Sequence, residues 1–285
     1  MHPLAEKYLR KSALPLFFCQ GCGDGTIIAA LMRAIDELGI IDDIAFASGI
    51  GCCAWIPVYV NADVLHTMHG RAIPIATALK LTNPKRNVMV FAGDGDCMGI
   101  GGNHLIHAAR RNVDITVVMV NNAIYGMTGG QTAPTTPHHA TTKTTPMGNA
   151  EFPFNACDVA IAAGATYVAR WTTAHPVQIT RAFKEAIGHK GFAFIEILSQ
   201  CPTQAGRLIY NTGDPVENFR MLKEMAVTRA KAEKMSAEEL AGKVVVGKLL
   251  EIEGRAELTD EVYALMGERQ GGISEEAKLA ANWRP

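Results

Sequence analysis

Two cysteines, Cys19 and Cys22, stand three positions apart in the stretch C-Q-G-C-G-D-G. Such a C-x-x-C pair serves as a redox dithiol, as half of a zinc site or as half of an iron–sulfur site. Two further cysteine-bearing stretches, S-G-I-G-C-C at 48–53 and S-Q-C at 199–201, each follow an apolar run that is typical of a strand. Four thiolates from these stretches could hold a zinc ion or a [4Fe–4S] cluster, and the cysteines alone do not decide between the two.

A second motif is the turn Gly93-Asp94-Gly95-Asp96, which lies between the strand-like run N-V-M-V-F-A and a predicted helix. The free N–H groups at the start of a helix can face an anion, and glycines let the backbone approach a phosphate closely. Asp94 would repel a phosphate unless a cation lay between them, and Mg²⁺ is readily anchored by one or two carboxylates. The next strand-like run ends in Asn121-Asn122, which offers an amide oxygen. The two turns together predict a diphosphate held through Mg²⁺.

The remaining cysteines and histidines fit structural roles better. Cys157 lies within a predicted helix and Cys97 follows the G-D-G turn without a partner at ligand spacing. Free cysteine is among the most buried residue types, so we expect both to pack in the core. His138 and His139 lie in the Thr- and Pro-rich stretch 131–154, where no cysteine or carboxylate stands at ligand spacing, and we expect an exposed loop. Loops of this length in compact domains are often functional.

The elements that must position these residues alternate between strands and helices. The predicted strands lie within 41–52, 87–96, 114–122, 165–170 and 191–201, and the predicted helices within 24–39, 71–84, 101–112, 154–165 and 175–189. The first helix carries an apolar stripe of Ile27, Ala30, Leu31, Ala34, Ile35 and Leu38. Nearly continuous apolar strands that alternate with helices predict an α/β fold, a parallel sheet with helices on both faces. Ligands of such sheets bind at the carboxyl ends of the strands, where the cysteine stretches and both turns lie.

Composition limits the class of protein. The chain has 285 residues, of which 48% are apolar and 19% charged, with a formal net charge of −1. This balance gives no sign of nucleic-acid binding, no uncharged apolar run is long enough for a membrane span, and we recognise no signal peptide. Seven cysteines without an export signal favour a reducing compartment, so we expect a cytoplasmic protein. We expect an α/β domain over 1–205 and a strandless, helical C-terminal extension over 206–285.

The two turns, G-D-G and N-N, resemble the thiamine diphosphate motif. On this resemblance Mg²⁺ is held by Asp94, Asn122 and the backbone carbonyl of Ile124. The diphosphate would be lined by Gly95, Asp96, Gly126 and Met127. The whole core is similar to the β subunit of the 2-oxoacid:ferredoxin oxidoreductases over about residues 10–205. The matching stretches are C-Q-G-C-G at 19–23, S-G-I-G-C at 48–52, H-G-R-A at 69–72, G-D-G-D at 93–96, N-N-A-I-Y-G-M-T-G-G-Q at 121–131 and Cys201.

The resemblance to this family resolves the cysteine question and implies further contacts. It implies a [4Fe–4S] cluster held by Cys19, Cys22, Cys52 and Cys201. The cluster would lie close to thiamine diphosphate, and oxidation of the carbanion bound to that cofactor needs an electron acceptor nearby. Spacing alone hardly separates Cys52 from Cys53, and we favour Cys52 because it directly follows G-I-G. The residues implied to contact thiamine diphosphate are Ile50, Gly51, Cys52, Cys53, His69, Gly70, Arg71 and Ala72. Without the resemblance, the stretch around His69 would be interpreted as a capped helix start.

The family also implies an activity and a partner. The reaction is the decarboxylation of a 2-oxoacid to acyl-coenzyme A and CO₂, with electrons passing to ferredoxin, or the reverse reductive carboxylation. The stretches A-W-I-P-V-Y and Y-G-M-T-G-G-Q-T-A-P-T-T-P favour 2-oxoglutarate, with pyruvate or a branched-chain 2-oxoacid as the alternative. We find no suitably placed glutamate to activate the pyrimidine ring of the cofactor. We therefore expect no catalytic side chain here beyond the cofactor sites, and an α subunit that supplies the glutamate in a heterodimer or a dimer of heterodimers.

Two other classes of function compete with this interpretation. One is a thiamine diphosphate enzyme without redox chemistry, in which the cysteines are incidental. The other is a structural or scaffold subunit with a zinc ion held by four cysteines. Colour distinguishes the second class, because an anaerobically purified cluster protein is brown and is bleached by dithionite, whereas a zinc protein is colourless.

Overall fold

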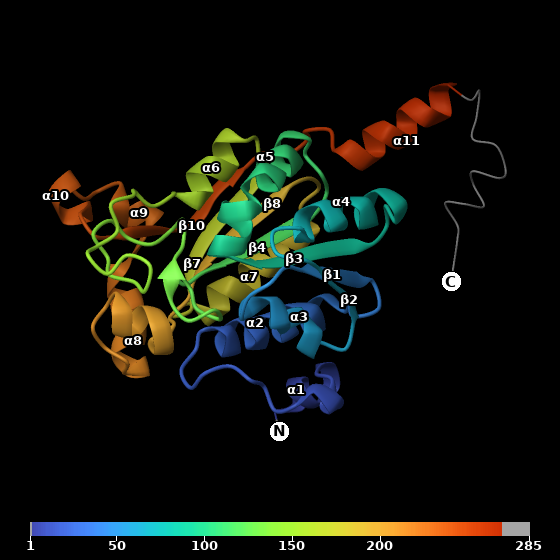
Figure 1. Ribbon diagram of the computed structural model, residues 1–285. Helices are drawn as coiled ribbons and strands as arrows, with labels where there is room; N and C mark the ends of the chain where they lie inside the picture. The colour runs from blue at the N-terminus through green and yellow to red at the C-terminus, as the bar shows by residue number, and fades with distance from the viewer. Residues whose placement is uncertain (1, 270–285) are drawn as a thin grey trace.

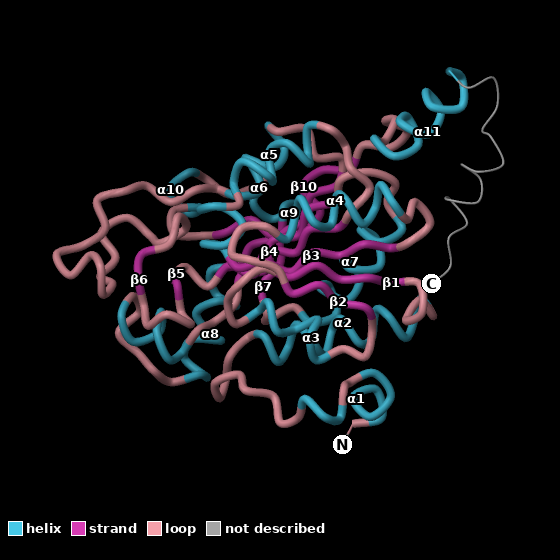
Figure 2. Tube along the Cα trace, turned by 45° about the vertical axis from the view of Figure 1, so that its right-hand side comes forward, coloured by secondary structure: helices cyan, strands magenta, loops and turns pink. Residues whose placement is uncertain are grey.

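The computed structural model describes residues 2–269. One eight-stranded sheet forms the centre of the molecule (Figure 1). The strand order is β2-β1-β3-β4-β8-β7-β10-β9, and neighbouring strands are parallel except for the antiparallel pair β10–β7. The strands are β1 Ile44–Ser48, β2 Asp63–His66, β3 Asn87–Gly93, β4 Thr116–Asn121, β7 Tyr167–Thr172, β8 Ala193–Leu198, β9 Ala226–Thr228 and β10 Val244–Glu251. Figure 2 shows a separate short hairpin, β5 Ile124–Tyr125 with β6 Gln131–Thr132, outside this sheet. The predicted α/β fold with a largely parallel sheet is confirmed.

Helices cover both faces of the sheet, because its central strands are buried on both sides. One face packs against α1 Pro3–Tyr8, α2 Asp24–Leu38, α3 Ile56–Tyr59 and α7 Pro176–Gly188. The other face packs against α4 Ala72–Thr82, α5 Gly102–Arg110 and α6 Ala156–Ala162. The two apolar layers that result hold the strands in register, so the last residues of β1, β3, β4 and β8 lie along one edge.

Helix α2 follows the predicted apolar stripe except at its last position. Ile27, Leu31 and Ile35 are fully buried against the sheet. Leu38 is 38% exposed, so its assignment to the core was wrong. The helix ends directly after it at Gly39, whose φ of 68° is a left-handed value that glycine adopts without strain.

The C-terminal region is only partly helical. It contains α8 Pro215–Met225, α9 Arg229–Ala232, α10 Ala237–Leu240 and α11 Leu258–Arg269. It also contains β9 and β10, and β10 extends the main sheet by pairing with β7. The prediction of a strandless extension was therefore wrong for residues 226–251. The run V-V-V-G-K-L-L-E has the β-branched residues of a strand, but its charged helical flanks masked this signal. Residues 270–285 of the predicted extension lie outside the described part of the chain.

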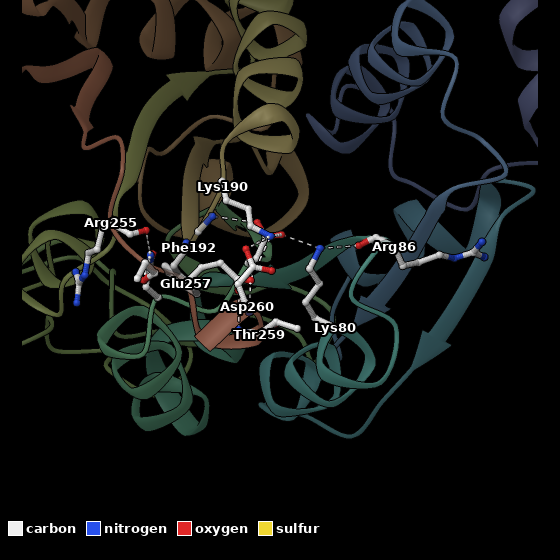
Figure 3. A network of polar contacts seen from close by, with 12 residues as sticks. Lys80, Arg86, Lys190, Phe192, Arg255, Glu257, Thr259 and Asp260 are labelled. Carbon is white, nitrogen blue, oxygen red and sulfur yellow. Dashed lines mark hydrogen bonds and ion pairs between the residues drawn. The ribbon is translucent and has the colours of Figure 1, made fainter. Parts of the chain in front are cut away.

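Figure 3 shows a network of charged side chains around the start of α11, which includes Lys80, Lys190, Glu257 and Asp260. Because Asp114 precedes β4 and Lys190 precedes β8, the network lies at the amino-terminal edge of the sheet, opposite the cysteine stretches. The ammonium group of Lys80, which is almost fully buried, lies 2.7 Å from a carboxylate oxygen of Asp114. Nζ of Lys190 lies 3.2 Å from Oε1 of Glu257 and 3.1 Å from Oδ2 of Asp260. Buried and networked ion pairs of this kind depend on both partners being present. No helix among residues 2–269 combines the length and the apolar character needed to cross a membrane.

Candidate functional site

A cavity of about 160 Å³ lies at the carboxyl ends of β1, β3 and β4. Its lining residues are Ile50, Gly51, Cys52, Cys53, His69, Gly93, Asp94, Gly95, Asp96, Val120, Asn122, Ile124, Tyr125, Gly126, Met127 and Thr128. The structure thus brings together the residues predicted to bind Mg²⁺ and those predicted to line the diphosphate. Three of the predicted contacts, Gly70, Arg71 and Ala72, do not line the cavity. The Arg71 guanidinium instead lies 3.0 Å from Nε2 of His104.

Asp94 and Asn122 supply oxygen atoms at one side of the cavity. Asp94 is 3% exposed, and burial raises the pKa of its carboxyl group to about 6. Its Oδ2 atom accepts a hydrogen bond from the Thr135 hydroxyl at 2.5 Å. Asn122 Oδ1 accepts from the backbone N–H of Ile124 at 3.2 Å. A buried carboxylate beside an amide oxygen and turn carbonyls is the donor set that suits Mg²⁺, and a divalent cation would offset the cost of burying the charge.

Asp96 lines the same cavity and is held by neighbouring groups. Its Oδ1 atom lies 2.8 Å from Nδ1 of His69 and accepts from the backbone N–H of Gly70 at 2.5 Å. Its Oδ2 atom is buried and has no hydrogen-bond partner within residues 2–269. Burial raises the pKa of this carboxyl group, since a buried charge is costly. His69 and Gly70 thus hold the carboxylate of Asp96 at the wall of the cavity.

Glycine is required by the packing at two positions around the cavity. A Cβ atom added at Gly95 would lie 2.1 Å from Cε1 of Tyr125, whose hydroxyl donates to the carbonyl of Gly95 at 3.1 Å. A Cβ atom at Gly49 would lie 1.7 Å from Oδ2 of Asp96. Neither position has room for a side chain. These close approaches shape a cradle in which backbone N–H groups can face an anionic ligand.

The predicted cluster cysteines gather beside this cavity. The loop that carries Cys19 and Cys22 contacts the segment before Cys201, because the N–H of Gly23 donates to the carbonyl of Gln200 at 3.2 Å. Burial raises the pKa of the Cys52 thiol to about 12, and the nearby Asp24, Cys201 and Cys19 act in the same direction. Burial also raises the pKa of Cys201, with Cys19 again among the neighbours. Cys19 and Cys201 are thus close enough to Cys52 to raise the pKa of its thiol, and Cys201 acts on the pKa of the Cys22 thiol in the same direction.

The other three cysteines are more deeply buried than this group. Cys53, Cys97 and Cys157 are buried, as expected for Cys97 and Cys157. Cys53 belongs to the apolar layer on the α2 side of the sheet and also lines the cofactor cavity, and its neighbours include Asp24, Asp96 and Cys52. No group of three or more His, Cys, Asp or Glu side chains within the described residues surrounds a single-metal position. A structural zinc ion needs four ligands at about 2.0–2.3 Å from one point.

Several polar residues near the site were missed by sequence reasoning. Thr135, which bonds to Asp94, lies in the long Thr- and Pro-rich loop, and only the length of that loop suggested a role. Arg170 on β7 and Glu196 on β8 form an ion pair, in which Nε of Arg170 lies 2.6 Å from Oε2 of Glu196. Each is a charged residue within a predicted buried strand, a position where an unpaired charge is not tolerated. That contrast was a signal that could have identified the pair.

A second, larger cavity of about 570 Å³ lies behind the first one, between the sheet, α8 and β10. Arg170 and Glu196 lie at its wall, as do Asn121 and Asn122 at the end of β4. The apolar part of its lining comes from Met221, Leu222, Met225, Val244, Val245 and Leu249. Asn122 lines both cavities, so the two lie on either side of the turn that follows β4.

Comparison with known proteins agrees with this geometry. Residues 49–197 match the family described as the thiamine pyrophosphate enzyme, C-terminal TPP-binding domain. The chain is 51% identical over 267 residues to the 2-oxoglutarate synthase subunit KorB of Methanocaldococcus jannaschii, covering 93% of this chain and 98% of that protein. It is 49% identical to the KorB subunit of Methanothermobacter marburgensis, covering 94% and 93%.

A solved structure extends the similarity to the fold. This chain resembles a chain of the 2-oxoglutarate:ferredoxin oxidoreductase from Magnetococcus marinus, solved with 2-oxoglutarate, coenzyme A and succinyl-CoA bound. The TM-score is 0.83 at 34% identity, covering 99% of this chain and 96% of that chain. The fold, the thiamine pyrophosphate-binding domain and the near full-length similarity lead to the same family. The chain belongs to the 2-oxoglutarate synthase KorB subunits, the β subunits of 2-oxoacid:ferredoxin oxidoreductases.

Proposed function

We propose that this chain is the cofactor-binding β subunit of a 2-oxoglutarate:ferredoxin oxidoreductase. With its partner it converts 2-oxoglutarate and coenzyme A to succinyl-CoA and CO₂ and passes the electrons to ferredoxin; the reverse reductive carboxylation uses the same site. The observation that carries the proposal is the cavity that joins the G-D-G and N-N turns and has cysteines at its edge. The substrate is inferred from the names of the KorB relatives and from the solved relative.

Thiamine diphosphate fits this cavity through Mg²⁺. Asp94, Asn122 and the carbonyl of Ile124 would hold the ion, because they offer one buried charge and two neutral oxygens at one side. Gly95, Asp96, Gly126 and Met127 would surround the diphosphate, and Ile50, Gly51 and His69 would close the opposite side. When bound, the cofactor supplies a carbanion for attack on the keto carbon. The protein contributes binding, orientation and electrostatics.

A [4Fe–4S] cluster is the group that best suits the four cysteines. Cys19, Cys22, Cys52 and Cys201 would be its ligands. Cys52 is favoured over Cys53 because Cys19 and Cys201 are among the neighbours of Cys52, whereas Cys53 is buried beside Asp24 and Asp96. The proposed reaction passes electrons to ferredoxin, and a [4Fe–4S] cluster carries electrons whereas a zinc ion has no redox chemistry. This difference favours the cluster over the zinc alternative.

The cluster would lie next to the cofactor. Cys52 lines the cofactor cavity, and so does Gly126. A Cβ atom added at Gly126 would lie 3.6 Å from the sulfur atom of Cys201. Two of the four proposed ligands thus adjoin the walls of the cofactor cavity. This proximity supports direct electron transfer from the bound cofactor to the cluster and argues against a thiamine diphosphate enzyme without redox chemistry.

The α subunit would complete the site from the side of the pyrimidine ring. Among residues 2–269 no glutamate lines the cofactor cavity, and the carboxylate of Glu196 is paired with Arg170. Large apolar side chains are exposed around the cavity and on the adjoining surface: Ile50, Trp55, Leu65, Met68, Ile100 and Met127. Exposed apolar side chains in such number mark an interaction surface. We propose that this face binds the α subunit, which brings the activating glutamate to the cofactor.

The requirement for a partner gives the first prediction. The chain purified alone under anaerobic conditions, with its cluster intact, is expected to show no 2-oxoglutarate-dependent reduction of viologen dye. Addition of the α subunit is expected to restore coenzyme A-dependent reduction, with 2-oxoglutarate faster than pyruvate or a branched-chain 2-oxoacid. Sustained turnover by the isolated chain would disprove the partner requirement, and a preference for another 2-oxoacid would correct the substrate.

A further inference from the structure

A buried chain of polar side chains runs behind the proposed Mg²⁺ ligands. The Nδ2 group of Asn121 donates to Oε1 of Glu196 at 2.8 Å. The other carboxylate oxygen of Glu196 accepts from Nε of Arg170 at 2.6 Å and from the thiol of Cys157 at 3.3 Å. Glu196 is only 2% exposed and does not line the cofactor cavity. It therefore has three donors around it and no contact with the proposed cofactor.

The other end of the Asn121 amide holds the turn that follows β4. Its Oδ1 atom accepts from the backbone N–H of Ala123 at 3.0 Å and lies 3.0 Å from the hydroxyl of Thr135, the residue that bonds to Asp94. Ala123 has a φ of 62°, a left-handed value that residues other than glycine rarely adopt. Its carbonyl accepts from the hydroxyl of Thr136 at 2.7 Å. These two bonds hold a strained residue in place.

The position of Ala123 makes this turn important for the metal site. Ala123 lies between Asn122 and Ile124, whose side-chain and backbone oxygens are proposed to bind Mg²⁺. Only a fixed backbone at Ala123 keeps these two oxygens on the same side as Asp94. Strained backbone of this kind persists where its surroundings over-determine it. The hydrogen bond from the Ala123 N–H to Asn121 is one of those constraints.

Only one orientation of the Asn121 amide satisfies all of its neighbours. The N–H of Ala123 needs an acceptor, so Oδ1 of Asn121 must face it. The NH₂ group then faces residue 196, which must accept a hydrogen bond, and a carboxylate offers acceptors only. If residue 196 offered a donor instead, the amide would turn, and its NH₂ group would meet the N–H of Ala123. Whether residue 196 offers an acceptor or a donor to Asn121 thus decides which way the amide points.

We propose that Glu196 is a positioning residue for the Mg²⁺ site. It fixes the amide of Asn121, and Asn121 holds the turn that presents Asn122 and the Ile124 carbonyl to the ion. Arg170 and Cys157 fix the carboxylate of Glu196 in turn. This inference rests on the proposed Mg²⁺ site, and it adds a residue that touches neither the metal ion nor the cofactor.

The test is Mn²⁺ binding, measured by electron paramagnetic resonance in the presence of thiamine diphosphate. The protein is the complex with the α subunit, stripped of cofactor and divalent cations. In the Glu196→Gln variant, the side-chain oxygen of the new glutamine faces Arg170. Its NH₂ group then faces the NH₂ group of Asn121, so that two donors meet and the hydrogen bond is lost. We expect the Kd for Mn²⁺ to rise about tenfold or more, as is typical when a group that orients metal ligands is lost. The double variant N121D/E196Q reverses the donor and the acceptor, and we expect it to recover most of the lost affinity.

Three further variants separate positioning from general stability. Asn121→Asp alone places a carboxylate next to the carboxylate of Glu196, and the two repel each other. We expect this variant to bind Mn²⁺ as weakly as Glu196→Gln does. Asn121→Ala keeps the Arg170–Glu196 pair, and it gives the same expected loss if Glu196→Gln does not fold. Asn112→Ala is the matched control, because Asn112 is a buried amide that holds the carbonyls of Arg255 and Ala256, away from the site. We expect it to lower the Tm and leave the Mn²⁺ affinity unchanged.

The outcomes are distinct. Wild-type affinity in Asn121→Ala or in a folded Glu196→Gln variant would overturn the inference. If the double variant binds Mn²⁺ no more tightly than Glu196→Gln, Glu196 acts only as the structural partner of Arg170, and the positioning role is wrong. If Asp94→Ala leaves Mn²⁺ binding intact, the proposed Mg²⁺ site itself is wrong. If Asp94→Ala abolishes binding while the Glu196 and Asn121 variants bind normally, only the positioning role fails.

Discussion

The Asp94→Ala variant is expected to lose tight binding of thiamine diphosphate and Mg²⁺. The diphosphate and the ion hold each other in place, and Asn122 and a backbone carbonyl are neutral ligands that cannot replace a carboxylate. Removal of a buried charged partner typically costs about 3 kcal/mol or more, which corresponds to a loss of affinity of at least about a hundredfold. Titration calorimetry of the complex with the α subunit, at saturating Mg²⁺, measures this loss.

The Asp94→Asn variant separates the binding of the ion from the stability of the fold. Burial raises the pKa of Asp94 from 3.8 to about 6. Its carboxylate therefore destabilises the metal-free fold, by an amount that grows as the pH rises from 3.8 to about 6 and is complete above that. Asparagine removes this charge. We expect the metal-free variant to have a Tm at pH 8 no lower than that of the wild type, but to bind the cofactor weakly. Unchanged cofactor affinity in either variant would rule out Asp94 as a ligand.

The Cys201→Ala variant is expected to lose the cluster. Each of the four proposed cysteines supplies one iron ligand, and alanine supplies none. The brown colour and electron transfer to dye should disappear, and the iron content should fall well below about four atoms per chain. Iron analysis and visible absorbance of the anaerobic protein measure this change. A full complement of iron in Cys201→Ala would contradict the ligand assignment.

Neighbouring cysteines provide the matched controls. Cys53→Ala changes a buried cysteine next to a proposed ligand, and we expect it to keep the cluster, whereas Cys52→Ala should lose it. The opposite result would exchange the two assignments. Cys157→Ala should also keep all four irons, because Cys157 is buried in the other apolar layer and its thiol bonds to Glu196. Zinc in place of iron in the anaerobic wild-type protein would favour the scaffold alternative.

Some of the proximities at the candidate site could be predicted from the sequence, and others depend on the tertiary fold. Asp94 and Asn122 could be placed together from the sequence, because both follow apolar runs that had to be neighbouring parallel strands. Arg170 and Glu196 could not, since the contact between two strand residues depends on the register between β7 and β8. The role of Thr135 depends on how a long loop folds back onto Asp94. No local pattern in the sequence determines that path.

The C-terminal region shows a different limit. The run that forms β10 contains β-branched residues, but the strand that joins it to the main sheet is β7, which lies more than seventy residues earlier in the chain. The charged, helical sequence on both sides of this run led to the prediction of a helical extension. The sequence does not show that β7 has a free edge for another strand, because that depends on the strand order of the sheet. Tertiary pairing therefore overrode local propensity in this segment.

The central claim is that one chain holds the thiamine diphosphate and the electron acceptor of a 2-oxoglutarate oxidoreductase. The most direct measurement is the visible absorbance of the oxidised, anaerobic complex with the α subunit when 2-oxoglutarate and coenzyme A are added without dye or ferredoxin. We predict partial bleaching of the brown absorbance by 2-oxoglutarate in the wild type and none in Asp94→Ala, although dithionite bleaches both. A complex that dithionite bleaches but 2-oxoglutarate leaves unchanged would contradict the claim.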